Sequence, residues 1–385
     1  MRPQRDARLR AGHLWVYRTD IARVDGGPQD GDAVGVVSSS GRHLGTGLLN
    51  TRSVITVRLL TPEDRDLDEA FFRTRLERAL ALRARIAADS AACRLVYSEG
   101  DFLPGLIVDR YADVLVMQTL TLGMDKRKAM LARLLAELAG PRGIYARNDP
   151  AVRRLEGLPE ERGWLAGGGA TQVEVEEGGC RFLVDIEHGQ KTGFFLDQRE
   201  NRVRAAELAP GGRVLDCFAY TGAWAIHAAV RGAHAVTGME ISGTALALAE
   251  ENAARNTVSD RCQWLRENAF DGLRRLARTD ARFDVVVLDP PAFVKTRETL
   301  SSGLAGYKEI NLRALKLLGP NGWLVTCSCS YHVDAAHLQA VVNEAALDAR
   351  RRVRVVEARS QARDHPVHPA MPETRYLKCL ILAVE

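Results

Sequence analysis

From about residue 200 onward, the sequence alternates between strand-like and helix-like patterns. Consecutive apolar positions such as residues 285–288, Val-Val-Val-Leu, are typical of parallel strands that are buried on both faces. The alternation predicts a doubly wound, Rossmann-like α/β sheet, in which ligands bind at the carboxyl ends of the strands. The expected strands cover residues 213–218, 235–240, 262–266, 283–289 and 322–328, followed by candidates at 353–357 and 376–384.

The residues before this sheet carry other patterns. Short alternating strands from residue 13 to 60 predict a small β-barrel or meander, and the charged segment 61–66 reads as a linker. The next part mixes strand-like runs with helical spacing at 68–88 and 126–138, and it ends in a hairpin at 171–186. A chain of 385 residues usually exceeds one hydrophobic core, so we expect three domains. They are a small β domain at 1–64, an α+β domain at 65–187 and the Rossmann-like domain at 188–385. The expected strands before residue 150 are 14–17, 33–37, 43–49, 54–60, 94–97, 106–109, 114–119 and 143–147.

Composition narrows the class of protein. With 46% hydrophobic and 26% charged residues, the chain is typical of a soluble globular protein and not of a disordered one. The net charge of +4 permits a polyanionic partner without requiring one. The seven cysteines are scattered and form no Cys-x-x-Cys pair, so we predict no metal site and a reducing compartment. The sequence has no signal-like apolar core or membrane-spanning stretch, which predicts a cytoplasmic protein without a membrane partner.

The first strand of the predicted sheet ends in an acid and continues into a turn. Asp216 is followed by Phe218, Tyr220 and Gly222, after which a helix is expected. The segment lacks both the Gly-x-Gly-x-x-Gly pattern of dinucleotide sites and a Walker lysine. One acid and one glycine suit a cofactor with a cationic sulfonium and an amino acid head, which predicts S-adenosylmethionine. The alternative is an ordinary strand-to-helix turn.

Further cofactor contacts are expected at the next two strand ends. Glu240 lies 24 residues after Asp216, close to the offset of about 20 at which a carboxylate binds ribose hydroxyls in such folds. We therefore predict that Glu240 binds the ribose and that its neighbour Ile241 contributes to the same site. The alternative is a solvated carboxylate or a helix cap. After the third strand, Asn268 and Ala269 are predicted to lie at the adenine.

The fourth strand ends in the most specific short signal of the chain, Asp289-Pro290-Pro291-Ala292-Phe293. Two consecutive prolines fix their own backbone and hold the preceding Asp289 extended. A rigidly held acid at this edge of the sheet predicts a platform for a planar substrate. Asp289 is predicted to serve both catalysis and the cofactor, and Pro290, Phe293 and Lys295 to bind substrate. A rigid turn without chemistry is the alternative.

Two cysteines, Cys327 and Cys329, lie at the end of the fifth strand. They point to the same side of a strand, so either thiol can face the site, where cationic groups would convert it into a nucleophile. The other five cysteines are interpreted as small buried hydrophobic residues. Before the sheet, residues 188–202 combine glycines, aromatics and charges. We predict that Lys191 and Gln198 of this segment reach the methionine carboxylate, with domain packing alone as the alternative.

With these motifs, the chain resembles the ribosomal RNA large subunit methyltransferase I family over nearly its whole length. The resemblance rests on residues 12–17 (GHLWVY), 103–110 (LPGLIVDR), 189–202, 289–293 (DPPAF), 328–330 (SCS), 364–367 (DHPV) and 376–378 (YLK). It implies an N-terminal PUA-like domain that binds RNA, S-adenosylmethionine as cofactor, 23S ribosomal RNA as partner and a homodimer. It also implies that a cysteine attacks carbon 6 of cytosine so that carbon 5 accepts the methyl group.

The Ser-Cys-Ser pattern of the family aligns with Cys329, and Cys327 stays the rival nucleophile. Asp289 would then bind the N3 and amino edge of the cytosine. Many other cytosine carbon-5 enzymes have a second cysteine where this chain has Ala292, so another base must remove the carbon-5 proton. Two alternative functions remain open: a methyltransferase that modifies a base nitrogen on the same scaffold, and a noncatalytic RNA-binding assembly factor.

Overall fold

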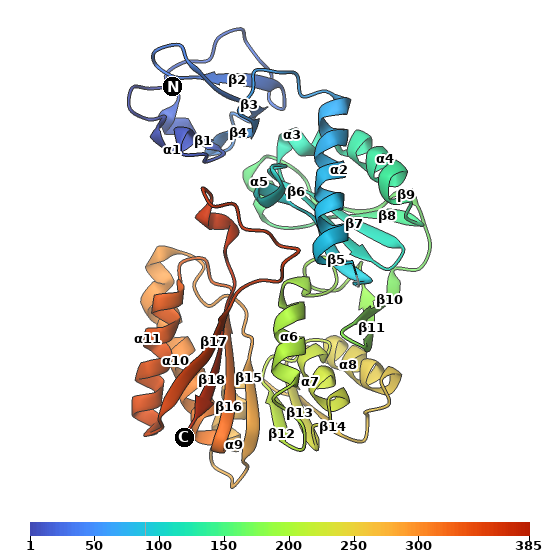
Figure 1. Ribbon diagram of the computed structural model, residues 1–385, viewed down its shortest axis with the longest axis vertical. Helices are drawn as coiled ribbons and strands as arrows, with labels where there is room; N and C mark the ends of the chain where they lie inside the picture. The colour runs from blue at the N-terminus through green and yellow to red at the C-terminus, as the bar shows by residue number, and fades with distance from the viewer. Residues whose placement is uncertain (89) are drawn as a thin grey trace. The chain divides into compact units, whose positions relative to one another are not determined.

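The computed structural model describes residues 1–88 and 90–385, and these residues form two compact units (Figure 1). Each unit is assembled from segments that are distant in the sequence. The predicted three-domain division at 64/65 and 187/188 stays a prediction. Unit 1 consists of Met1–Val175, Val184–Leu196 and Arg363–Thr374, and unit 2 of Glu176–Leu183, Asp197–Ala362 and Arg375–Glu385.

Unit 1 begins with a four-stranded antiparallel sheet in the order β1-β4-β3-β2. The predicted strands are confirmed in type and place. Glycine is required at Gly47 of β3, because a Cβ there would lie 2.3 Å from the carbonyl oxygen of Arg58 on β4. The elements of this part are α1 (Ala7–Arg10), β1 (Trp15–Tyr17), β2 (Ala33–Val37), β3 (His43–Leu49) and β4 (Ile55–Thr61).

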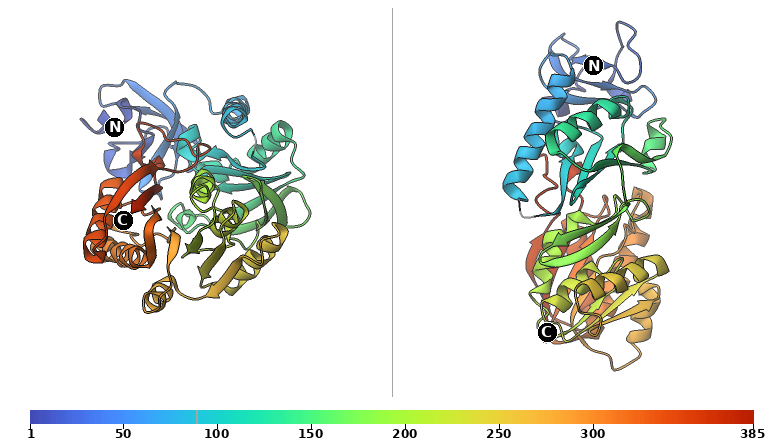
Figure 2. Two further views of the ribbon diagram at one scale, coloured as in Figure 1. Left: turned by 60° about the horizontal axis from the view of Figure 1, so that its bottom comes forward. Right: turned by 90° about the vertical axis from the view of Figure 1, so that its right-hand side faces the viewer.

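A five-stranded mixed sheet in the order β5-β6-β7-β8-β9 forms the rest of unit 1. Only β7 and β8 pair in parallel, because helix α4 connects them. Helices α2 and α4 lie side by side against this sheet (Figure 2). Strand β9 was not among the predicted strands. The strands are β5 (Ala92–Tyr97), β6 (Leu106–Tyr111), β7 (Val114–Thr119), β8 (Gly143–Asn148) and β9 (Glu161–Gly167), and the helices are α2 (Glu69–Ile86), α3 (Leu122–Asp125), α4 (Lys128–Ala139) and α5 (Val152–Leu155).

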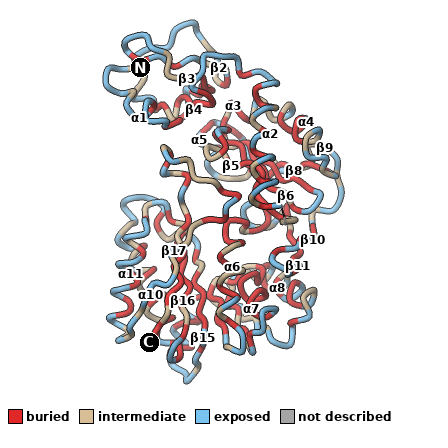
Figure 3. The backbone as a smooth tube through the Cα atoms, viewed as in Figure 1, coloured by how far each residue is buried: buried red, intermediate tan, exposed pale blue. Residues whose placement is uncertain are grey.

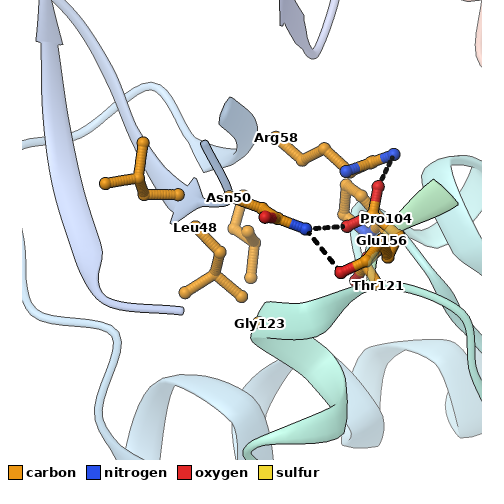
Figure 4. A pocket seen from close by; sticks show the side chains of 9 residues that line it. Leu48, Asn50, Arg58, Pro104, Thr121, Gly123 and Glu156 are labelled. Carbon is orange, nitrogen blue, oxygen red and sulfur yellow. Dashed lines mark hydrogen bonds and ion pairs between the residues drawn. The ribbon is translucent and has the colours of Figure 1, made fainter. Parts of the chain in front are cut away.

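A small pocket within unit 1 lies where the four-stranded sheet meets the segments around α3 and α5 (Figure 4). Glu156 is almost fully buried there, and it accepts hydrogen bonds from Asn50 Nδ2 (2.7 Å) and pairs with Arg58 Nη2 (2.9 Å). The cavity is about 10 Å³ in volume, which is close to the minimum for one water molecule. This space is therefore far too small for a nucleoside cofactor.

Unit 2 is built on a seven-stranded sheet in the order β14-β13-β12-β15-β16-β18-β17. Strands β12 to β16 are parallel, and β18 pairs antiparallel with both β16 and β17. This arrangement confirms the predicted Rossmann-like class. The strands are β12 (Arg213–Asp216), β13 (Ala235–Glu240), β14 (Cys262–Arg266), β15 (Phe283–Leu288), β16 (Leu318–Ser328), β17 (Val353–Arg359) and β18 (Lys378–Val384).

Helices cover both faces of this sheet, so its central strands are buried (Figure 3). Helices α7 and α8 pack on one face with α6 beside α7, and α9, α10 and α11 pack on the other. No helix in the described part of the chain is long and apolar enough to cross a membrane. The helices are α6 (Arg199–Ala206), α7 (Ala223–Val230), α8 (Gly243–Arg255), α9 (Ala269–Leu276), α10 (Leu300–Leu317) and α11 (Ala335–Ala349); the predicted hairpin is β10 (Gln172–Glu177) with β11 (Cys180–Asp185).

Candidate functional site

Three carboxylates lie at the carboxyl ends of the neighbouring strands β13, β12 and β15. Glu240 ends β13, Asp216 ends β12, and Asp289 follows β15 directly. Asp216 is completely buried, and its Oδ1 atom has no hydrogen-bond partner. Burial and the nearby charges of Asp289 and Glu240 raise the pKa of Asp216 to about 7. Negative charge is thus crowded at this edge of the sheet.

The turn after β12 is tied to the end of β13. The backbone N–H of Tyr220 donates to Glu240 Oε2 (3.0 Å), and the N–H of Ser242 donates to Glu240 Oε1 (2.9 Å). Gly222 has a φ of 82°, and a Cβ there would lie 2.6 Å from the ring of Trp264. Glycine is therefore needed for both the backbone conformation and the close packing. Glu240 also has a structural role, because it accepts the N–H of Ser242, the residue that caps the start of α8.

Asp289 is held in one orientation by two donors from different segments. Gln198 Nε2 donates to Asp289 Oδ1 (2.9 Å), and Trp224 Nε1 donates to Asp289 Oδ2 (3.1 Å). Gln198 is itself oriented by Asn201, whose side-chain amide donates to Gln198 Oε1 (2.7 Å). Trp224 was not predicted from the sequence, although its position two residues after Gly222, at the start of α7, was a usable signal.

The remaining predicted residues of the sheet edge differ in exposure. Phe293 is half-buried, and its ring packs against those of Tyr307 (4.7 Å between centroids) and Phe270 (5.6 Å). Asn268 caps α9, because its Oδ1 accepts the N–H of Phe270 (2.9 Å). The other predicted positions are Phe218 (half-buried), Ile241 (64% exposed), Ala269 (buried), Pro290 (buried) and Lys295 (exposed).

The two candidate thiols have different surroundings. Cys327 is completely buried and faces Cys379, its direct partner on β18; burial raises the pKa of the Cys327 thiol well above its usual value. Cys329 follows the end of β16 and is half-buried, and its thiol donates to the carbonyl oxygen of Pro290 (3.9 Å). Of the two, Cys329 therefore lies nearer to solvent and against the Asp-Pro-Pro segment.

The serines on either side of Cys329 are bound to one phenol. Ser328 Oγ donates to the Tyr307 hydroxyl (2.9 Å), and Tyr307 also shares a hydrogen bond with Ser330 Oγ (2.9 Å). Ser330 Oγ in turn accepts the N–H of Val294 (3.1 Å), so the segments after β15 and β16 are connected. Tyr307 comes from α10, and its role was not predicted from the sequence.

Lys191, the remaining predicted cofactor residue, belongs to unit 1. It is exposed with a φ of 55°, and its ammonium lies 4.4 Å from the ring centroid of Phe195. The next residue, Thr192, is buried and donates to Asp109 Oδ2 (2.6 Å). The segment that carries Lys191 is therefore anchored within unit 1, and the role of Lys191 toward the cofactor stays a prediction.

Comparisons with known proteins place the chain in a family. It is 40% identical to a protein named "Ribosomal RNA large subunit methyltransferase I" from Alteromonas mediterranea, over 100% of this chain and 98% of that protein. It is 41% identical to one of the same name from Shewanella denitrificans, with the same coverage. The chain belongs to this family. The family resemblance inferred from the sequence is confirmed.

Other comparisons agree with membership of the ribosomal RNA large subunit methyltransferase I family. Residues 120–382 match the family model of S-adenosylmethionine-dependent methyltransferases, and residues 1–62 match a PUA-like domain. Two solved methyltransferase structures, each 21% identical, share the fold over 98% of this chain and 97% of theirs. One is complexed with SAH (TM-score 0.86), and the other is from Streptococcus mutans (TM-score 0.84). The predicted cofactor, S-adenosylmethionine, is thereby confirmed.

The crowded carboxylates fit this cofactor. Its sulfonium and ammonium groups are positively charged, and a cation near Asp216, Glu240 and Asp289 relieves their mutual repulsion. The unpartnered Oδ1 of buried Asp216 offers an acceptor at the same place. The strand-end acid, the spacing and the Asp-Pro-Pro motif suggested Asp216, Glu240 and Asp289 in turn, and the structure brings them to adjacent strand ends.

Proposed function

We propose that the chain forms 5-methylcytosine in 23S ribosomal RNA, with S-adenosylmethionine as methyl donor and Cys329 as covalent nucleophile. The name shared by the relatives supports RNA of the large ribosomal subunit as the substrate. The observation that carries the covalent part is the position of the Cys329 thiol, half-buried against the carbonyl of Pro290, next to Asp289. A base that is bound at the Asp-Pro-Pro segment would meet this thiol.

In the proposed reaction, the sulfur of Cys329 bonds to carbon 6 of the cytosine. The electron pair of the C5–C6 double bond then makes carbon 5 nucleophilic. S-adenosylmethionine would supply the electrophilic methyl group that carbon 5 accepts, and its sulfur would keep the electron pair of the broken S–CH3 bond. A base removes the proton from carbon 5, the C5–C6 double bond re-forms, and the C6–S bond breaks to release Cys329 as thiolate.

Asp289 has the proposed role of binding the N3 and amino edge of the cytosine and supplying a proton at N3, which it takes back when the C6–S bond breaks. The hydrogen bonds from Gln198 and Trp224 support the binding part of this role, because they fix the plane of the carboxyl group before substrate arrives. Pro290, Phe293 and Lys295 are proposed to contact the base, which must leave its stack to enter the site.

The PUA-like domain is proposed to bind the RNA backbone through N-terminal arginines. In the described part of the chain, the side chains of four of them, all except Arg5, also form hydrogen bonds or ion pairs within the protein. Arg18 donates to the carbonyl oxygens of Thr51 and Arg52 (2.9 Å each), and Arg8 lies 3.8 Å from Glu373. Arg5 is exposed and is the clearer test of phosphate binding. The candidate phosphate contacts are Arg2, Arg5, Arg8, Arg10 and Arg18.

The test of the covalent mechanism is Cys329→Ser in the full chain. We expect methyl transfer to be abolished while S-adenosylmethionine binding, measured by calorimetry, persists. Cys262→Ser is the matched control, because Cys262 is also half-buried but lies on β14, and we expect it to retain activity. Full activity of Cys329→Ser would refute the covalent mechanism.

The substrate is tested by mass mapping of ribosomal RNA from cells with and without the gene, followed by transfer of labelled methyl to the missing site. A methyl group on a base nitrogen would instead favour the thiol-independent alternative. Lack of cofactor binding would favour the noncatalytic assembly factor. A homodimer and a cytoplasmic location are part of the proposal, and sedimentation analysis tests the first.

A further inference from the structure

Lys378 lies beside the strand end that carries Cys329. It is the first residue of β18 and is paired in register with Ser328, the last residue of β16. Its Nζ atom donates to the carbonyl oxygens of Ser330 (2.7 Å) and Tyr376 (2.8 Å). These two bonds hold the amino group next to the residue that follows Cys329.

Lys378 is half-buried, and Cys329 and Asp334 are the ionisable groups that act on its charge. Burial lowers the pKa of the Lys378 ammonium to about 8, whereas the nearby Cys329 and Asp334 act in the opposite direction. Asp334 also interacts with His337, whose N–H and ring Nδ1 both lie 2.8 Å from its Oδ1. On the other side of the segment, Tyr307 binds Ser328 and Ser330 through its hydroxyl. At neutral pH, Lys378 still carries most of its charge.

The interaction between Lys378 and Cys329 works in both directions. A negative sulfur favours the charged form of Lys378, and the positive ammonium favours the thiolate form of Cys329. The interaction energy is the same in both cases, because it belongs to the pair of charges. Partial burial strengthens this attraction, because less water screens it. Only a thiolate attacks an electron-poor carbon efficiently.

We infer that Lys378 is the charge partner that holds Cys329 as a thiolate, and this inference rests on the proposed function of Cys329. The S–H bond breaks and its proton leaves to solvent, and the ammonium held at the carbonyl oxygens of Ser330 and Tyr376 stabilises the thiolate before the base is attacked. The same ammonium stabilises the sulfur when the C6–S bond breaks at the end of the reaction. Lys378 acts through Cys329 and is therefore a positioning residue.

A purely structural role is the competing explanation, because the two hydrogen bonds alone tie residues 376 and 330 together. Lys378→Gln separates the two explanations: the amide keeps hydrogen-bond donors but has no charge. Lys378→Arg keeps both the hydrogen-bond donors and the charge. Lys316→Met removes one positive charge from an exposed position in the last turn of α10 and serves as the control.

The experiment measures the rate of Cys329 alkylation by iodoacetamide against pH, by peptide mass spectrometry on the full chain without RNA or cofactor. In Lys378→Gln we expect the midpoint to rise by about one pH unit and the rate at pH 7 to fall about tenfold. Lys378→Arg and Lys316→Met should retain profiles close to wild type. An unchanged midpoint and rate in Lys378→Gln would overturn the inference.

Folding of each variant is checked by thermal melting, and Cys262 alkylation serves as an internal reference. If Lys378→Gln does not fold, Lys378→Asn gives the same test, because its amide also has hydrogen-bond donors and lacks the charge. The outcome is independent of catalysis. A shifted profile together with full activity of Cys329→Ser would support the charge pair and refute the covalent mechanism, whereas an unshifted profile refutes the charge pair whatever the activity.

Discussion

Among single residues, Asp216 shows most clearly that the site favours a bound cation. Its pKa of about 7 arises from burial and from the charges of Asp289 and Glu240. A bound cation favours the ionised form, so binding of S-adenosylmethionine should release a proton below pH 7. We expect affinity to rise with pH, by up to about tenfold per unit below pH 7, and to level off above it. Calorimetry in buffers with different ionisation enthalpies measures this proton release.

Two variants test the assignment to Asp216. Asp216→Asn should bind the cofactor more weakly and lose most of the pH dependence between pH 6 and 8. Asp284→Asn is the control, because Asp284 lies near the opposite end of β15, where it accepts the N–H of Arg213 (2.7 Å). An unchanged proton release in Asp216→Asn would show that another group titrates.

Tyr307 provides a second prediction at the scale of one residue. Tyr307→Phe removes the hydroxyl that binds Ser328 and Ser330 and leaves both serine side chains in a buried region with one partner fewer. We expect a loss of about 1–2 kcal/mol in the free energy of unfolding, measured in urea. Because the segment around Cys329 also loses its anchor, methyl transfer should fall more than cofactor binding does. Equal activity of variant and wild type would contradict a positioning role.

At the scale of elements, the sequence predicted the sheet of unit 2 well. Strands such as β15 are buried on both faces, so they are continuous apolar runs that stand out from helical spacing. Strand β9 was missed, because it is only half-buried and carries glycine and charge instead of an apolar run. Strand ends also located Asp216, Glu240 and Asp289, since the end of a parallel strand is where a ligand site lies.

Tyr307 and Lys378 could not be found in this way. They come from α10 and β18, and they reach the site only through the order of strands and the packing of helices. Cys329 was favoured over Cys327 only through the family pattern. Cys327 is the more buried of the two, and it lies opposite Cys379 on β18, a strand far along the chain.

The tip of the β10–β11 hairpin contributes a buried ionic cluster to unit 2. Glu177 binds Arg202 of α6 through two hydrogen bonds (2.8 Å each) and His227 of α7 (3.2 Å). Burial alone would raise the pKa of Glu177, but Arg202 and His227 outweigh it and lower the pKa to about 2. The cluster therefore contributes stability above the ordinary glutamate pKa of about 4.5, which is lost as the pH falls from there toward 2.

Glu177→Gln should accordingly destabilise the protein at pH 7 by about 3–5 kcal/mol, because Arg202 stays buried without its counter-ion. Urea unfolding at several pH values measures the effect, and the difference from wild type should shrink between pH 4.5 and 3. Glu176→Gln, an exposed neighbour in the same hairpin, should change stability by less than about 0.5 kcal/mol. A pH-independent difference would contradict the ionic origin.

For the whole molecule, the path of the chain is the feature that the sequence did not reveal. Residues 363–374 lie between two segments of unit 2 but belong to unit 1. Their anchors are single buried side chains, without an apolar run or a helical period that a sequence pattern would show. Met371 accepts the N–H of Leu14 on its sulfur (3.3 Å), and Asp364 is completely buried. Domains defined as contiguous ranges of the sequence cannot describe a segment that is inserted in this way.

Asp364→Ala tests whether this segment stabilises unit 1. Asp364 Oδ2 accepts the N–H of Arg94 on β5 (2.9 Å), and its carbonyl oxygen accepts from Arg83 of α2 (2.8 Å). Loss of the carboxylate leaves a buried N–H with one acceptor fewer, which costs about 1–3 kcal/mol. Hydrogen exchange, measured by mass spectrometry, should therefore speed up in α2 and β5 but not in β12–β16. Asp348→Ala, at an exposed position of α11, serves as the control and should change the exchange rate in neither region. An equal loss of protection in both regions would contradict this prediction. It would mean that the two units unfold together, so that residues 363–374 do not stabilise unit 1 alone.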